Sequence, residues 1–460
     1  MDSLAERRFT PDDQRAFAAM SGDHNPMHMD AQAARRLQAG RPVVHGIHAV
    51  LWAIEAAAEL PTGAEALTVQ FDRMIYVGDL CRLRRGRRGA EGTHLEIVVD
   101  DVAVTRIGLL PAADRPPPPA SSDARTLALE TRGAEVAAAF PRAAAALGLA
   151  TLVDLVGLSK LVGMVCPGLH SIFRGFSVAR GAGAAVGAEM RFSVLRDDAR
   201  FNLVSLRVDG TGLSGQVDAF RRPPPTAQPG IDALRGRVQP EAFAGRRALV
   251  VGGSRGLGEL TAKLLALGGA AVTITFAVGD GEAGRVAEEI RAAGGRCEVL
   301  RLDVRQRPIA GHLPAGRVFD QLYYFATPSI FGKRGRALDA ALLDTMTAFY
   351  VHAFYETCAA LRDAGPHAID VFYPSSVAVA ARPAGLTEYA MAKAAGEVLC
   401  ADLPRLLKGV RAHVRRLPRL QTDQTASVQP VETGSAIDEM LAAIHSVQPT
   451  APDIGPGTLR

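Results

Sequence analysis

The sequence lacks the features of a secreted or membrane-spanning protein. Its five cysteines are scattered, odd in number and without metal-type pairs, so we expect free thiols in a reducing compartment and no bound metal. No apolar run reaches the roughly 18 residues needed to cross a bilayer. Residues 1–10 are charged and contain no apolar signal region. A cytoplasmic location without a membrane partner is therefore expected.

The sequence also lacks a large excess of positive or negative charge. A formal net charge of +4 is mild for 460 residues, and it gives no reason to expect a nucleic-acid partner. Apolar residues make up 48% of the chain, which is enough to build several buried cores.

Two proline-rich stretches divide the chain, at residues 115–119 and 221–229. Consecutive prolines favour extended linkers and cannot continue a helix. We therefore predict domains at residues 1–114, 125–222 and 240–460.

The first two segments read as diverged copies of one unit. Each has an apolar helix, at residues 46–60 and 150–165. Each helix precedes four segments of strand character, at 67–71, 81–85, 95–99 and 102–110, and at 171–178, 186–195, 201–208 and 215–220. A long helix followed by antiparallel strands suits a helix wrapped in a curved sheet, and two such units would bury each other's open faces.

A polar loop follows the first predicted helix, which Thr10, Pro11 and Asp13 start well. The loop, S-G-D-H-N-P-M-H-M-D, is dense in groups that are costly to bury unless paired. We expect it to hold Asp23 and His28 side by side. A carboxylate beside an imidazole can deprotonate one water while the imidazole returns a proton.

The same segment resembles the MaoC-like, R-specific enoyl-CoA hydratases of the hotdog fold. The resemblance rests on F-A-A-M-S-G-D-H-N-P-M-H-M-D, on P-V-V-H-G-I from Pro42, and on V-Q-F-D-R-M-I-Y-V-G-D from Val69; it covers most of residues 9–110. It implies that Asp23 and His28 are catalytic and that Asn25 braces their loop. It also implies that the backbone N–H of Gly46 polarises the thioester carbonyl.

Other polar residues near these motifs are expected to be structural, namely His24, His45 and His48.

The second segment resembles a hotdog helix and its exit turn without the Asp and His. We expect a non-catalytic half that completes the acyl tunnel, with packing roles for Ser159 and His170 in preference to substrate contacts.

The third segment opens on a buried strand and a glycine-rich turn, R-A-L-V-V-G-G-S-R-G-L-G, from Arg247 to Gly258. Glycines there let a pyrophosphate approach a helix N-terminus. A second strand (271–276), a helix (282–293) and a third strand (297–302) ending in Asp303-Val304 follow. The pattern resembles the short-chain dehydrogenase/reductases, a Rossmann fold with a doubly wound parallel sheet.

That resemblance implies a nicotinamide cofactor. The residues it assigns to the cofactor are Gly252, Ser254, Arg255, Gly256, Leu257, Gly258, Asp303, Val304, Tyr389, Lys393 and, loosely, Thr422. No acidic residue ends the second strand, where NAD-specific members hold the ribose hydroxyls. Arg255 could meet a 2′-phosphate instead, so NADP(H) is favoured over NAD(H).

The chemistry of this segment lies in Y-P-S-S-V and E-Y-A-M-A-K. Tyr389 and Lys393 are four residues apart and share one helical face. By resemblance, Tyr389 exchanges the proton, Lys393 lowers its pKa and holds the ribose, and Ser376 binds the carbonyl oxygen.

The segment departs from the family in three places. Tyr324-Phe-Ala-Thr327 replaces the usual N-N-A-G turn, and Pro418-Arg-Leu-Gln-Thr422 replaces a P-G turn. Phe349 or Tyr350 stands where an asparagine normally holds a water for proton relay, and the alignment leaves open which of the two.

Together the resemblances imply an α+β double hotdog followed by an α/β Rossmann domain. The expected enzyme is a bifunctional ketoreductase–dehydratase of fatty-acid or polyketide metabolism, acting on coenzyme A or carrier-protein thioesters through an R intermediate. Two alternatives stay open: an oxidative hydratase–dehydrogenase, and a thioester-binding protein whose reductase half is inactive.

Two further expectations concern partners. The protein is expected to form a homodimer or a higher homo-oligomer, since both folds commonly pair. An arginine cluster, Arg82, Arg84, Arg85, Arg87 and Arg88, is expected to be a solvated hairpin edge. The alternative is a docking surface for the phosphates of coenzyme A or for an acidic carrier protein.

Overall fold

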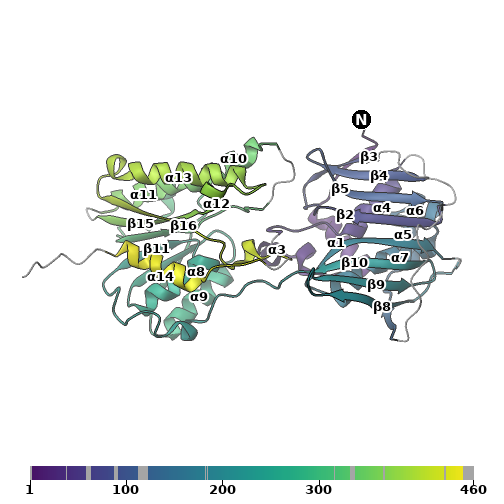
Figure 1. Cartoon of the computed structure of the whole chain (residues 1–460), viewed down its shortest axis with the longest axis horizontal. Coiled ribbons are helices and arrows are strands. Elements are labelled where there is room, and N and C mark those ends of the chain that lie inside the picture. Colours follow the sequence, from purple (N-terminus) through teal and green to yellow (C-terminus); the bar gives the residue numbers. More distant parts are fainter. Residues whose placement is uncertain are drawn as a thin grey trace, which may run out of the picture. The chain divides into compact units, whose positions relative to one another are not determined.

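The computed structural model describes residues 3–37, 39–57, 64–86, 92–111, 123–181, 183, 185–314, 316–331, 337–365, 368–428 and 431–448. The chain forms two compact units (Figure 1). The first comprises Met1–Pro225 with Ala426–Val431, and the second comprises Thr226–Thr425 with Glu432–Arg460. The proline-rich stretch at 115–119 lies outside the described residues, and the division of the first unit into two domains stays a prediction.

The first unit contains one ten-stranded antiparallel sheet in the order β1-β3-β4-β5-β2-β7-β10-β9-β8-β6. Its first five strands in chain order are β1 (Ala5–Arg8), β2 (Ala66–Phe71), β3 (Leu80–Arg85), β4 (Thr93–Val99) and β5 (Val102–Leu110). The other five are β6 (Arg125–Ala128), β7 (Ser171–Arg180), β8 (Glu189–Asp198), β9 (Leu203–Asp209) and β10 (Leu213–Arg221). The predicted strands of both segments are confirmed, with bounds shifted by up to three residues.

The two halves of this sheet have the same connectivity. From the centre outwards the first half runs β2, β5, β4, β3, β1, and the second runs β7, β10, β9, β8, β6. The halves meet where β2 pairs antiparallel with β7, with Val69 opposite Phe176. In each half the outermost strand precedes the central helix in the chain and the other four follow it.

Two apolar helices fill the core of the first unit. Helix α4 (Gly46–Ala56) and helix α7 (Leu149–Lys160), extended by the π-helical turn η1 (Leu161–Val165), are nearly all buried and pack against each other. The expected helix at residues 46–60 ends at Ala56, because Ala57 is extended. Residues 58–60 lie outside the described residues.

Shorter helices complete this unit. They are α1 (Pro11–Ser21), α2 (Pro26–Met29), α3 (Ala31–Arg35), α5 (Gly133–Ala139) and α6 (Pro141–Leu147).

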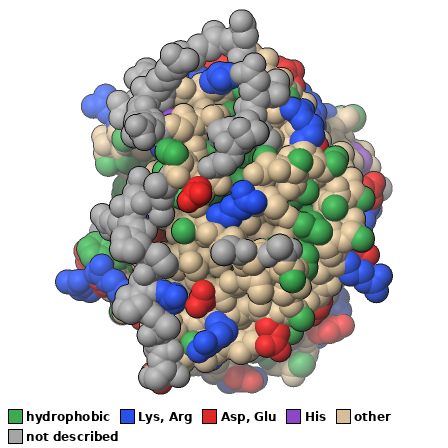
Figure 2. Space-filling model, turned by 90° about the vertical axis from the view of Figure 1, so that its right-hand side faces the viewer, with side chains coloured by type: hydrophobic (Ala, Val, Ile, Leu, Met, Phe, Trp, Pro, Cys, Tyr) green, Lys and Arg blue, Asp and Glu red, His purple; other side chains and the backbone are tan. Residues whose placement is uncertain are grey.

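On the face drawn in Figure 2, cationic, anionic and apolar side chains are interspersed. Within the arginine cluster, Arg82 is paired with Glu6 at 2.9 Å and Arg84 with Glu96 at 2.8 Å. Arg87 and Arg88 lie outside the described residues.

The second unit is built on a six-stranded parallel sheet in the order β13-β12-β11-β14-β15-β16. The strands are β11 (Arg247–Val251), β12 (Ala271–Phe276), β13 (Arg296–Arg301), β14 (Gln321–Tyr324), β15 (Ile369–Ser376) and β16 (Val410–Leu417). This order, with a reversal between β11 and β14, confirms the Rossmann-like arrangement.

Helices cover both faces of the parallel sheet. One core packs α8 (Gly256–Leu267), α9 (Asp280–Ala292) and α14 (Ala436–Val447) against one face. A second core packs α10 (Ala340–Thr347), α11 (Phe354–Asp363) and α13 (Thr387–Leu406) against the other. Between α10 and α11 the chain forms a π-helical turn, η4 (Ala348–Ala353), and the short helix α12 (Ala378–Ala381) follows β15.

All five cysteines are buried and free, which confirms the expectation of free thiols. In the parts of the chain that the structure describes, no single helix is long and apolar enough to span a membrane. Two consecutive helices, Pro141–Leu147 and Leu149–Val165, are together long and apolar enough to do so, judged by length and composition only, but they are bent by 111° relative to each other.

Candidate active sites

The loop that carries Asp23 is fixed at both ends by helix caps. Thr10 caps α1, as expected from the sequence, and it forms a capping box with Asp13. Helix α1 ends at Gly22, whose φ of 72° lies in the left-handed region that favours glycine. Asn25 then caps α2 by accepting a hydrogen bond from the Met27 N–H. The segment between the two helices is thereby held in a single tight turn.

Asp23 is buried, with 2% of its surface exposed. One carboxylate oxygen accepts a hydrogen bond from the Ser159 hydroxyl at 2.7 Å, and the other accepts from the Asn25 N–H at 3.2 Å. These donors come from α7 and from the loop itself. They compensate for burial of the charge and fix the carboxylate plane.

His28 faces the same space from α2. Its Nδ1 lies 2.7 Å from the Val43 carbonyl oxygen, which can only accept, so Nδ1 carries the proton. The other ring nitrogen, Nε2, is then free to take or return a proton. This is the arrangement that acid–base chemistry by a neutral imidazole requires.

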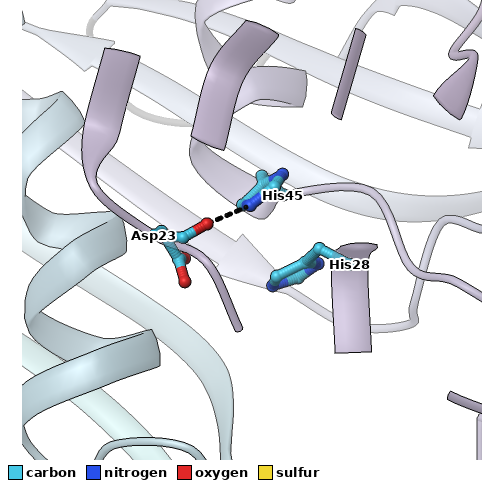
Figure 3. Close-up of side chains that lie close together, drawn as sticks. All are labelled: Asp23, His28 and His45. Carbon is cyan, nitrogen blue, oxygen red and sulfur yellow. Dashed lines mark hydrogen bonds between the residues drawn. The ribbon is translucent and has the colours of Figure 1, made fainter. Parts of the chain in front are cut away.

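His45 lies behind this pair (Figure 3). Its Nε2 is 3.0 Å from the Asp23 backbone oxygen and its Nδ1 is 2.9 Å from Gln14 Oε1. Burial holds the pKa of His45 well below its usual value, and the ring stacks on His28 with centroids 4.0 Å apart. The expected structural role fits these contacts. His24, by contrast, is exposed. His48 is buried like His45, and burial lowers its pKa to about 4.

Ligand atoms of Asp23, His28 and His45 all lie within 4.8 Å of one another. Two groups that close can hold one water between them, because each hydrogen bond to that water spans about 2.8 Å. Asp23 and His28 can therefore share a water, as the loop motif implied.

Asn25 and Gly46 take positions consistent with the roles that the resemblance assigned to them. The Asn25 amide donates to the carbonyl oxygens of Gly163 and Leu169, at 3.0 and 3.2 Å, which ties the loop to the second half of the unit. Gly46 begins α4, where backbone N–H groups lack helical partners. A side chain there would collide with Phe71, whose ring would lie 2.9 Å from an added Cβ.

These residues open onto one cavity, whose free space is about 630 Å³ when the open solvent at its mouth is included. Asp23, Asn25, His28 and Gly46 all line it. The second half of the unit contributes Ser159, Val162, Gly163, Ser171, Ile172 and Phe173. The cavity wall thus comes from both halves, and the second half also supplies a hydrogen-bond donor to Asp23.

Gly163 is predicted to be essential for the position of Asp23. A Cβ at this glycine would lie 2.4 Å from Asp23 Oδ1, so Gly163→Ala must displace the carboxylate. Displacements of about 1 Å can cost 10²-fold in rate, and we expect at least about a tenfold fall in hydratase kcat.

The matched control for this variant is Gly157→Ala. Its Cβ would meet the flexible end of Leu129 at the same 2.4 Å, so both variants strain α7 and its extension. Equal kcat values for the two variants, measured by hydration of a short 2-enoyl thioester, would contradict the assignment.

The glycine-rich turn of the second unit has the close backbone approaches that a pyrophosphate site needs. Gly252 has φ 81°, and an added Cβ there would meet the Phe325 and Ala326 backbone at 3.0–3.1 Å. A Cβ at Gly258 would lie 2.3 Å from the Gly252 oxygen. Helix α8 begins at Gly256, followed by Leu257, and its first N–H groups can hold an anion.

Arg255 caps this helix but is already engaged. Its guanidinium lies 3.6 Å from the Asp423 carboxylate, and Ser254 beside it is buried. Thr422, next to Asp423, packs near the turn, since its methyl group lies 4.0 Å from the place of a Cβ on Gly256. A 2′-phosphate at Arg255 would therefore compete with Asp423.

Asp303 and Val304 follow β13 at the carboxyl edge of the sheet, where a Rossmann fold binds its ligand. The guanidinium and the backbone N–H of Arg305 donate hydrogen bonds to the Asp303 carboxylate at 2.7–3.2 Å, and these bonds lower the pKa of that carboxyl group. Val304 is buried in the core beside it.

Ser376, Tyr389 and Lys393 come together as expected. Burial raises the pKa of Tyr389, and a hydrogen bond with Ser376 opposes that shift. Lys393 is buried and donates to the Pro374 carbonyl at 2.7 Å. Burial lowers the pKa of this lysine to about 7. Perturbed pairs of this kind mark functional sites.

Of Phe349 and Tyr350, the two residues that the alignment left open, Tyr350 faces Lys393. Tyr350 is 1% exposed, and its ring centroid is 3.8 Å from Lys393 Nζ and 5.8 Å from the Tyr389 ring. Phe349 is only partly buried. Its backbone oxygen accepts the Tyr324 hydroxyl at 2.9 Å. The Tyr350 hydroxyl bonds Thr327 of the altered turn.

Sequence reasoning missed the contributions of Gly163 and Asp423 and underrated Ser159. The serine was expected to pack and instead donates to Asp23. Each of the three acts on a residue more than 100 positions away, and no local pattern signals such a contact.

Comparisons with known proteins give a family match in each of the two units. Residues 1–105 match the model of the MaoC like domain, and residues 246–430 match that of the short chain dehydrogenases. A peroxisomal hydratase-dehydrogenase-epimerase of Saccharomyces cerevisiae is 29% identical over 102 residues, which are 21% of this chain and 11% of that protein. An uncharacterised oxidoreductase of Methylorubrum extorquens is 44% identical over 62 residues, which are 14% and 25% of the respective chains.

Two similar solved structures are distant likenesses. A short-chain dehydrogenase from Burkholderia cenocepacia, in complex with NADP, has 24% identity and a TM-score of 0.40, covering 46% of this chain and 94% of that one. A short-chain dehydrogenase/reductase from Serratia marcescens has 22% identity and the same TM-score, covering 45% and 92%. The family matches, together with the two folds, show that the chain carries an N-terminal MaoC-like dehydratase domain followed by a C-terminal short-chain dehydrogenase domain.

Proposed function

We propose that the protein is a bifunctional enzyme acting on acyl thioesters of coenzyme A or of a carrier protein. Its second unit reduces a 3-oxoacyl thioester to the (R)-3-hydroxyacyl compound with NADPH, and its first unit dehydrates that compound to the 2-enoyl thioester. The observation that carries the proposal is the cavity shared by Asp23, His28 and the first N–H groups of α4. Both reactions use the 3-hydroxyacyl thioester, so fusing them makes one product the other's substrate.

In the dehydratase half, the N-terminus of α4 receives the thioester carbonyl and stabilises the enolate oxygen. One member of the Asp23–His28 pair removes the proton at C2, and the other protonates the departing hydroxyl group, which leaves as water. Hydration is the reverse, with the water held between the two groups. Ser159 and Asn25 keep the carboxylate in place.

The repeated connectivity of the first unit supports a double hotdog, with residues 1–114 as the catalytic half and 125–222 as the half that closes the acyl cavity. Residues 240–460 form the reductase domain in this proposal.

The five free cysteines support a reducing compartment. We propose a homo-oligomer because both domain families commonly pair.

The glycine turn fits a dinucleotide, because added side chains at Gly252 and Gly258 would meet backbone and close the turn. The proposed contacts are the N-terminus of α8 with the pyrophosphate, Asp303 with the adenine, Lys393 with the nicotinamide ribose, and Thr422 with the carboxamide. When bound, the cofactor supplies the hydride. Ser376 orients the substrate carbonyl, and Tyr389 gives the proton to its oxygen.

NADPH is predicted to bind more tightly than NADH, with Arg255 as the phosphate contact. Charge-assisted contacts contribute about 1.5–3 kcal/mol, so Arg255→Ala should reduce the preference roughly 10- to 100-fold. Because Asp423 competes for the guanidinium, Asp423→Asn should strengthen the preference. Dissociation constants from fluorescence titration test both variants, and equal constants for the two cofactors in every variant would remove this argument.

The second candidate is the same enzyme run oxidatively. The name of the yeast relative pairs a hydratase with a dehydrogenase, which favours that direction. The deciding experiment incubates the protein with 3-oxobutyryl thioesters of coenzyme A and of a carrier protein, with NADPH or NADH, and identifies products by mass. A 2-enoyl product formed with NADPH supports the proposal. In a parallel incubation with a 3-hydroxybutyryl thioester and NAD⁺, formation of NADH and the 3-oxo product, without NADPH-linked reduction in the first incubation, supports the rival. Cofactor binding without turnover in either incubation indicates a binding protein.

A further inference from the structure

Lys393 lies in a cage whose parts come from two elements, η4 and β15. The Tyr350 ring of η4 is 3.8 Å from its Nζ, and the Tyr373 ring of β15 is 4.9 Å away. The Pro374 carbonyl accepts its hydrogen bond at 2.7 Å. We call these three groups the lysine cage. A cation over an aromatic face is attracted to the ring, most strongly where water is excluded.

The backbone and its neighbours aim Tyr350 at the lysine. The π-helical turn at Ala348–Ala353 inserts an extra residue into a helix that otherwise continues from α10 into α11. The hydroxyl of Tyr350 bonds Thr327, at the turn where the family sequence N-N-A-G is replaced. The two departures from the family pattern thus touch each other, and both fix the orientation of one ring.

Other groups around the lysine give it little compensation for burial. Glu397 and Cys400 of α13 favour its charged form, but Glu397 is itself paired with Arg416 at 2.7 Å, and burial raises the pKa of Cys400 to about 12. Burial also raises the pKa of Tyr350, Tyr373 and Tyr389, so all three rings stay neutral. The ring faces and the Pro374 carbonyl are therefore principal stabilisers of the ammonium.

We propose that Tyr350 is a positioning residue of the reductase site, whose ring holds the Lys393 ammonium in the place where the family uses an asparagine and a water. The inference rests on the proposed reductase function and names a different means of keeping the lysine charged and in place. The ring, rather than the hydroxyl, does this work.

The test compares Tyr350→Leu, which removes the ring, with Tyr350→Phe, which keeps it. The chain has five lysines, so lysine labelled with ¹³C and ¹⁵N gives few signals, and Lys393→Arg identifies that of Lys393. A desolvated cation–π contact corresponds to about one pKa unit or more. The pKa of Lys393, followed by NMR, should fall by about that amount in Tyr350→Leu relative to Tyr350→Phe.

Turnover gives a second readout with a defined sign. Losing the ring disfavours the charged lysine, so the lysine loses its proton at lower pH, and the alkaline limb of kcat for NADPH oxidation should move down by a similar amount. Equal Lys393 pKa values in the two variants, with activity reduced evenly at all pH values, would overturn the proposal. That result would show that the Tyr350 ring has a purely structural role. A pKa difference without any NADPH oxidation by the wild type would support the cage and sink the reductase function instead.

Discussion

Tyr389→Phe is expected to lower kcat for NADPH oxidation with a 3-oxoacyl thioester by at least about 100-fold, the usual contribution of a general acid. In the wild type, the Tyr389 hydroxyl is the proton donor of the proposed reaction, and its hydrogen bond with Ser376 places it beside the carbonyl site. The phenylalanine ring preserves packing against Tyr350, so NADPH binding should persist.

Two controls separate chemistry from folding. Hydration of a short 2-enoyl thioester should be unaffected, because Asp23 and His28 belong to the other unit. Tyr323→Phe removes a hydroxyl of a fully buried tyrosine, whereas Tyr389 is partly buried, and Tyr323 belongs to the opposite core of the parallel sheet. This variant should leave the reductase rate unchanged. Reductase activity that survived in Tyr389→Phe would show that another group donates the proton.

Asp23→Asn is expected to abolish hydration, with a loss of about 100-fold or more, while NADPH still binds. The amide cannot accept a proton, and its NH₂ group would face the N–H of Asn25 or the hydroxyl of Ser159, which now donate to carboxylate oxygens. Loss of chemistry and loss of orientation therefore act together.

Asp30→Asn is the matched control for this variant. Asp30 lies seven residues later, is exposed, and caps α3 through the N–H groups of Gln32 and Ala33, a role that asparagine also fills. Absorbance of the enoyl thioester measures both variants. An Asp23→Asn enzyme that kept more than about a tenth of the wild-type rate would refute the assignment.

The sequence by itself determined most of the local structure and supplied the candidates for the reacting groups. Thr10, Gly22 and Asn25 are capping and turn residues, so the loop that carries Asp23 could be located from short-range rules. Strand spacing and the glycine turn predicted the parallel sheet, and the spacing of Tyr389 and Lys393 placed them on one helical face. These features depend on neighbours within a few residues, which the sequence displays directly.

Only the tertiary structure decided how those groups are supported. Ser159 and Gly163 reach Asp23 from the second half of the unit, about 140 residues away, and Asp423 reaches Arg255 from a distance of 168 positions. Tyr350 rather than Phe349 faces Lys393 because a π-helical turn changes the helical phase there. Helix phase and long-range contacts follow from how whole elements pack, and no periodicity in the chain encodes them.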